Sequence, residues 1–97
     1  MDADDVRAMR IKQDRRMILE VLRMASPGFL SFNCLRQVLP EVEEDNLRRD
    51  IAYLLDKGYI ERIKPQANEE WDDRKYRITA EGDEIANRIL KDPALNP

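Results

Sequence analysis

Apolar residues recur at helical spacing in four stretches of the chain, and two shorter segments alternate apolar with polar residues. The helical stretches are Asp4–Ala25, Ser31 or Asn33 to about Leu39, the segment from the Glu41–Asp45 turn to Lys57, and about Ala80–Lys91. The alternating segments are Tyr59–Lys64 and Arg74–Thr79. A period near 3.6 residues indicates an amphipathic helix, and a period of two indicates a half-buried strand. The pattern therefore predicts an α+β domain in the order helix, helix, helix, strand, strand, helix.

The boundaries of these elements coincide with residues that favour turns and caps. The first three helices are expected to end at Ser26-Pro27-Gly28, at Pro40 and at Gly58. Phe29 and Leu30 predict a very short strand after the first turn, and Thr79 is the expected N-cap of the fourth helix. The segment Pro65–Asp73 is polar and acidic, so it is expected to be the loop that joins the two strands into a hairpin.

The predicted core consists of the apolar face of each helix. Its members are Met17, Ile18, Val21, Leu22, Ala25, Leu35, Val38, Leu39, Leu47, Ile51, Leu54, Leu55, Ile85, Ala86, Ile89 and Leu90. A chain of 97 residues supports one such core, so we expect a single domain over residues 1–97. The core is expected over about 14–91, with a helical extension at 4–13 and a short tail at 92–97.

Composition removes several classes of function. The chain has no histidine, one cysteine and three widely separated glycines, which disfavours histidine catalysis, cysteine–zinc sites and glycine-rich phosphate loops. We therefore predict that the protein is not an enzyme and uses no cofactor or metal. No apolar run reaches membrane-spanning length, and the lone cysteine favours the cytoplasm. We expect Cys34, on the second helix, to be buried and structural.

The junction between the third helix and the hairpin carries a resemblance. Leu54-Leu55-Asp56-Lys57-Gly58-Tyr59-Ile60 and Tyr76-Arg77-Ile78-Thr79-Ala80-Glu81-Gly82 resemble the winged helix-turn-helix superfamily. With Ile18–Leu22 and Asp50–Leu54, they are similar to small winged-helix proteins of Mu-like bacteriophages and prophages. The resemblance implies a three-helix core, a two-stranded hairpin called the wing, and a C-terminal helix. It also implies a phage or bacterial transcriptional regulator in the cytoplasm of the bacterial host.

The resemblance further implies binding of double-stranded DNA through the third helix. In such folds the exposed face of this helix enters the major groove. The side chains expected to read base edges there are Asn46, Arg48, Arg49 and Tyr53. Arg74 and Lys75 on the wing and Arg16 on the first helix are expected to contact phosphates.

Acidic residues support an alternative, which is a protein–protein interaction module without DNA binding. The net charge is −3, and Glu43, Glu44 and Asp45 begin the third helix where a DNA binder is usually basic. The wing tip is acidic as well, through Glu69, Glu70, Asp72 and Asp73. Trp71 lies among these acids and is expected to fold back onto the hairpin, with an interface anchor as its other interpretation.

The first half of the first helix is densely basic and only weakly apolar. Arg7, Arg10, Lys12, Arg15 and Arg16 lie there, with Asp5, Asp14 and Glu20 at spacings that neutralise part of the charge. In the superfamily that the chain resembles, the first and last helices often build dimers. The sequence therefore also predicts a homodimer, with apolar contacts from Val6, Met9, Ile11, Ile85, Ile89 and Leu90.

Overall fold

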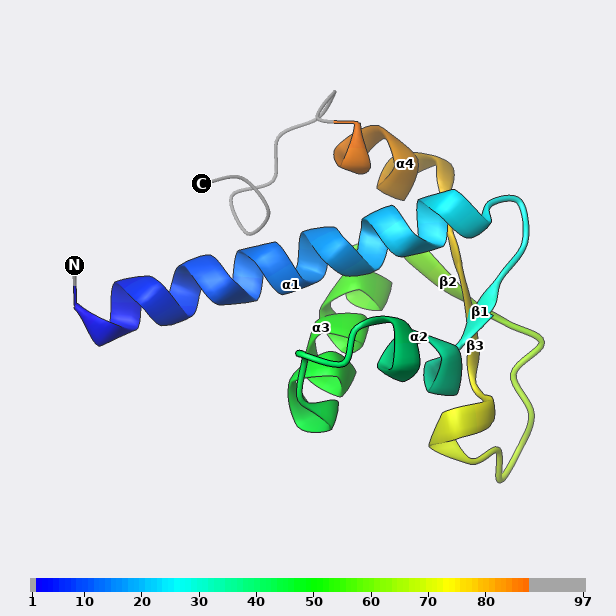
Figure 1. Cartoon of the computed structure of the whole chain (residues 1–97). Coiled ribbons are helices and arrows are strands. Elements are labelled where there is room, and N and C mark those ends of the chain that lie inside the picture. Colours follow the sequence, from blue (N-terminus) through cyan, green and yellow to red (C-terminus); the bar gives the residue numbers. More distant parts are fainter. Residues whose placement is uncertain (1, 88–97) are drawn as a thin grey trace.

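The computed structural model describes residues 2–87, which form four α-helices and a three-stranded antiparallel sheet (Figure 1). In chain order the elements are α1 (Ala3–Ala25), β1 (Leu30–Ser31), α2 (Phe32–Val38), α3 (Glu44–Asp56), β2 (Ile60–Ile63), the 3₁₀ turn η1 (Trp71–Asp73), β3 (Lys75–Ile78) and α4 (Ala80–Ala86). The predicted α+β class is confirmed.

The sheet has the order β1-β3-β2, so the last strand lies in its centre. In β2 and β3, Ile60 pairs with Ile78 and Ile63 with Lys75. On the other side of β3, Leu30 pairs with Tyr76. The predicted short strand is therefore shifted by one residue, and it joins the hairpin to the segment that leads into α2. Phe29 stays outside it and is 49% exposed.

Side-chain caps explain where three of the helices begin. The Asp2 carboxylate accepts a hydrogen bond from the N–H of Asp5, and the Ser31 hydroxyl accepts one from the N–H of Cys34. Thr79 caps α4 as predicted. Its hydroxyl accepts a hydrogen bond from the N–H of Gly82 at 3.1 Å. Such caps satisfy backbone donors that the first helical turn leaves unpaired. Of the two caps considered for the second helix, Ser31 is the one used.

The core lies where α1, α2 and α3 meet the sheet. Its fully buried members include Ile18, Leu22, Leu47, Ile51 and Leu54, all on predicted apolar faces. α1 packs against α3, α4 and β3, while α3 contacts β2 and α2 contacts β1. The spacing of apolar residues along the helices therefore predicted this part of the core correctly.

Two predictions about α2 are wrong. Val38 is 54% exposed and Cys34 is exposed as well, although both were expected to be buried. Leu35 and Leu39 are buried as expected, and Phe32, which was not among the predicted core residues, is buried with no exposed surface. Phe32 shares the buried face of α2 with Leu35 and Leu39, and its ring packs against Trp71.

Two glycines fix the path of the chain around the hairpin. Gly58 has φ +75°, the left-handed conformation expected of the residue that ends α3. Gly82 lies where α4 crosses the start of β2, and a Cβ there would be 1.9 Å from the carbonyl oxygen of Tyr59. The backbones approach this closely only because residue 82 has no side chain.

The N-terminal half of α1 extends away from the other described elements (Figure 1). Its apolar residues Val6 and Met9 are each 53% exposed. Ile85 is buried in the core, and so it is not free to supply the dimer contact that was also expected of it. Ile89, Leu90 and the predicted tail lie outside the described residues. Between residues 2 and 87, none of the helices combines the length and apolar character needed to cross a bilayer.

Candidate functional site

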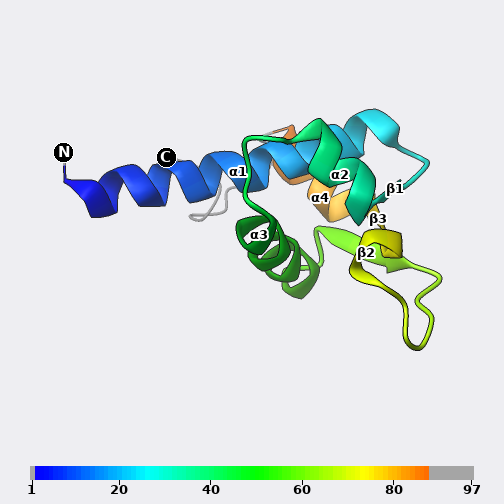
Figure 2. The same cartoon turned by 60° about the horizontal axis from the view of Figure 1, so that its bottom comes forward.

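The candidate site is the side of the molecule formed by α3, the start of α2 and the β2–β3 connection. Figure 2 shows this connection extending beyond the sheet, with η1 turned back beneath α2. Five of the seven residues predicted to bind DNA lie on α3 or in the η1–β3 segment, namely Asn46, Arg48, Arg49, Tyr53 and Arg74. The structure distributes these five between two clusters.

The first cluster forms around Trp71, the first residue of η1. The indole packs edge-on against the buried ring of Phe32, with 5.3 Å between ring centroids and 62° between planes. The guanidinium carbons of Arg74 and Arg48 lie 3.9 and 4.8 Å from the centroid of the Trp71 ring. Distances below about 6 Å allow cation–π attraction. Trp71 does fold back, as expected, but onto α2 and the core, and it brings Arg48 and Arg74 together.

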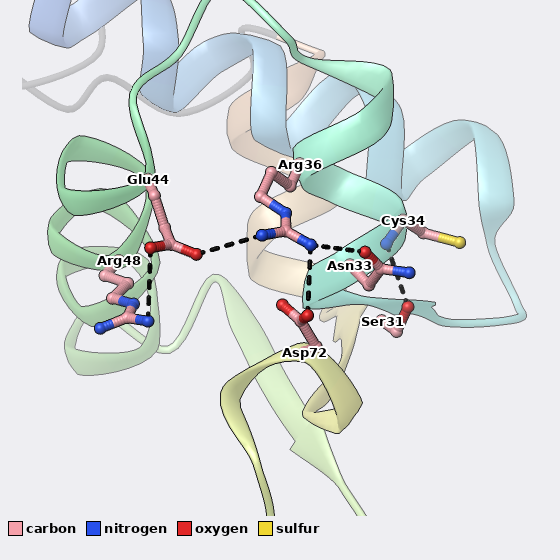
Figure 3. Close-up of polar contacts among 7 residues, drawn as sticks. All are labelled: Ser31, Asn33, Cys34, Arg36, Glu44, Arg48 and Asp72. Carbon is pink, nitrogen blue, oxygen red and sulfur yellow. Dashed lines mark hydrogen bonds and ion pairs between the residues drawn. The ribbon is translucent and has the colours of Figure 1, made fainter.

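Arg36 on α2 joins three elements within this cluster (Figure 3). Its guanidinium donates to Glu44 at 3.3 Å, to Asn33 at 2.8 Å and to Asp72 at 3.2 Å. Glu44 also forms an ion pair with Arg48, with 3.6 Å between Oε2 and Nη2. The contacts tie η1 to the first turn of α3.

Arg36 is absent from the residues predicted to bind DNA. Its two carboxylate partners are eight and thirty-six residues away in the chain. No periodic pattern relates positions at those separations. The only signal in the sequence was the presence of a basic residue on the second helix.

The second cluster forms around Asp50, which is fully buried on α3. Its Oδ1 accepts hydrogen bonds from Nε of Arg15 on α1 at 3.1 Å and from Nε of Arg49 at 3.2 Å. Its Oδ2 accepts a further bond from Nη2 of Arg49 at 3.3 Å, and Asn46 accepts from Nη1 of the same guanidinium. Arg49 is therefore held from two sides while 36% of its side chain remains exposed.

α1 adds two further groups to this second cluster. The Arg15 guanidinium carbon lies 3.7 Å from the centre of the Tyr53 ring, so Tyr53 packs towards α1 and is only half-exposed. Asp14, which is 9% exposed, lies close enough to Asp50 for charge repulsion. Burial first, and then the negative charge of Asp50, raise the pKa of Asp14 above its usual 3.8.

The two remaining predicted residues lie on other elements. Lys75 begins β3, and its Nζ is 5.9 Å from the centre of the Phe29 ring. Arg16 is half-buried on α1. The predicted residues thus lie on α1, α3, β3 and the segment just before β3. Arg48 and Arg74 both pack on Trp71, and Arg49 contacts Asn46 directly.

Carboxylates accompany the arginines of the hairpin as well. Arg62 on β2 forms an ion pair with Glu69 at 2.7 Å, and Arg77 on β3 pairs with Glu61, its partner across the strands. Beside the hairpin lies an open groove of about 660 Å³, with Asn68, Glu70 and Asp73 among its lining residues. Within residues 2–87, no group of three or more histidine, cysteine or carboxylate side chains is placed to hold a metal ion.

The arrangement offers hydrogen-bond donors and cationic groups at the surface. Arg36, Arg48 and Arg49 keep 36–40% of their side chains exposed while they contact carboxylates. Comparisons with protein-family models, with curated proteins and with solved structures find no match for this chain.

Proposed function

We propose that the chain is a winged-helix domain that binds double-stranded DNA as a homodimeric regulator of transcription in a phage or bacterium. The observation that carries the proposal is the element order α1-β1-α2-α3-β2-β3-α4, in which β1 joins the β2–β3 hairpin and α3 follows α2 after a short turn. In winged helices this order places the third helix for the major groove, with the hairpin beside it. Fold by itself leaves function open, so the residues must support it.

Arg49 is the residue best prepared to read a base. Asn46 and Asp50 fix the plane of its guanidinium, and a guanidinium held in one plane loses little entropy when it binds two acceptors of guanine. Arg48 and Arg74 are better suited to phosphate. Both pack on Trp71, and the ion pair of Arg48 with Glu44 is exposed enough for another anion to compete with it. In this proposal α3 supplies both kinds of contact.

The second candidate function is a protein–protein interaction module, and the acidic start of α3 favours it. Glu43, Glu44 and Asp45 are all exposed. They stabilise the N-terminus of the helix through its dipole but would repel phosphates nearby. A partner with a basic surface would be attracted to the same residues.

Binding to DNA is tested by fluorescence anisotropy with a labelled mixed-sequence duplex, first at low salt and then at rising salt. We expect the logarithm of affinity to fall linearly with the logarithm of salt, with a slope of about −0.9 for each phosphate contacted. Arg49→Ala should weaken binding several-fold more than Arg7→Ala, a matched control that removes the same charge from the exposed end of α1. Absence of binding by the unaltered protein at low salt would leave the protein-interaction module as the better proposal.

A further inference from the structure

The β2–β3 connection folds back so that one of its carboxylates, Asp72, contacts Arg36, which also contacts Glu44 of α3. Of the three acceptors around Arg36, Glu44 and Asp72 are anionic, and they reach it from two different elements (Figure 3). Glu44 joins Arg36 to Arg48, so two guanidiniums, one from α2 and one from α3, share one carboxylate. A carboxylate and a phosphate offer guanidinium the same kind of charged acceptor.

These internal contacts are weak enough to be exchanged. The side chains of Arg36, Glu44 and Asp72 are 40%, 42% and 48% exposed, so solvent screens each ion pair. Exposed pairs of this kind contribute between nothing and about 1 kcal/mol. A phosphate diester could therefore replace one of the carboxylates without a large loss of stability.

Asp72 is the carboxylate that can move. It lies in the three-residue turn η1, after the exposed segment 64–68, whereas Glu44 belongs to the first turn of α3. Displacing Asp72 requires a shift of the short turn η1, whereas displacing Glu44 would disturb the first turn of α3. Trp71 opposes the shift because it packs on Phe32 and on the two arginines Arg48 and Arg74.

We propose that Arg36 and Arg48 form a phosphate-binding subsite for the DNA backbone, which Asp72 partly occupies in the free protein and leaves when DNA binds. The inference rests on the proposed DNA-binding function and adds a residue, Arg36, and an intramolecular competitor, η1. The affinity for DNA is then set by two competing anions, the Asp72 carboxylate and a phosphate. Binding of the phosphate releases η1 from α2.

The experiment compares Asp72→Asn with Asp73→Asn. Both residues are exposed neighbours in η1, and both changes remove one negative charge, but Asp72 is the one that contacts Arg36. For Asp72→Asn we expect an affinity for the mixed-sequence duplex about two- to fivefold higher, the range that the loss of one exposed ion pair allows. Asp73→Asn should give a clearly smaller gain. Arg36→Ala should lower the affinity and reduce the salt slope by about 0.9.

Trp71 provides a second measurement that needs no DNA. It is the single tryptophan of the chain, so its fluorescence reports on η1 alone. Acrylamide should quench it more strongly in Asp72→Asn than in the unaltered protein or Asp73→Asn. Adding the duplex to the unaltered protein should also increase the quenching of Trp71 by acrylamide.

Three results would overturn the inference while leaving DNA binding intact. They are equal affinity gains from Asp72→Asn and Asp73→Asn, an affinity gain in Asp72→Asn without a change in Trp71 quenching, and an Arg36→Ala variant that binds with unchanged affinity and salt slope. A failure of the proposed function is different, because then neither the unaltered protein nor any variant would bind the duplex at low salt. That result would remove the subsite together with the function.

Discussion

Replacing Asp50 by asparagine removes the charge at the centre of the second cluster while keeping the shape of the side chain. Asp50 is fully buried and accepts three hydrogen bonds from Arg15 and Arg49. An asparagine can keep its oxygen towards the two Nε donors, but its amide group then faces Nη2 of Arg49. One charge-assisted bond becomes a contact between two donors, and the others lose the negative acceptor.

The cost follows from the burial of the partners. Removing one member of a buried ion pair typically costs about 3–5 kcal/mol because the remaining charge is left without a partner. Arg15 is 14% exposed and Arg49 is 36% exposed, so water can compensate part of this loss. We therefore expect Asp50→Asn to lower the free energy of unfolding by about 2–4 kcal/mol. For a domain of this size the melting temperature would fall by roughly 10–25 °C.

Urea unfolding followed by circular dichroism measures this change. The control is Asp45→Asn, an exposed position on the same helix, where the expected change is within about 0.5 kcal/mol. An Asp50→Asn variant that is no less stable than Asp45→Asn would refute the reasoning, because the buried carboxylate would then contribute nothing to holding α1 against α3.

Three further predictions concern stability and assembly. Because burial and Asp50 raise the pKa of Asp14, the stability that its protonation provides is full below pH 3.8 and is lost as the pH rises through the raised pKa. Asp14→Asn should therefore raise the free energy of unfolding at neutral pH, and urea titrations should show no gain below pH 3.8. Gly82→Ala should cost about 3 kcal/mol by the same assay, since its Cβ would meet the backbone of Tyr59, whereas Gly58→Ala should cost only about 1 kcal/mol for its positive φ. The predicted homodimer would bury Val6 and Met9 of α1, which are each 53% exposed. Light scattering after size-exclusion chromatography should then find a dimer, and Met9→Glu should convert it to a monomer.

The boundaries of the elements were predictable because local chemistry decides them. Gly58 ends α3 in the left-handed conformation, and Thr79 caps α4 through its own hydroxyl. Both effects act within a few residues, so they can be read directly from the chain. The buried faces of α1 and α3 were predictable for a related reason, since their length lets the helical period appear clearly.

The short second helix shows where this reasoning stops. Over seven residues, an apolar face containing Val38 and one containing Phe32 fit the period almost equally well. Packing of Phe32 against Trp71, nearly forty positions further along the chain, turned the helix so that Val38 and Cys34 face solvent. Contacts at such sequence separations leave no periodic trace.

The sequence by itself determined the element order, the helix ends at Gly58 and Thr79 and most of the core, because hydrophobic period and turn chemistry are local properties. The tertiary structure decided which charges meet. Arg36 contacts Asp72, Arg15 and Arg49 share Asp50, and Arg48 and Arg74 stack on Trp71. Charge pairing depends on distances between elements far apart in the chain, and one arginine has many carboxylates within reach before folding. Only the folded chain shows which arginines beside α3 are bound by the protein's own carboxylates.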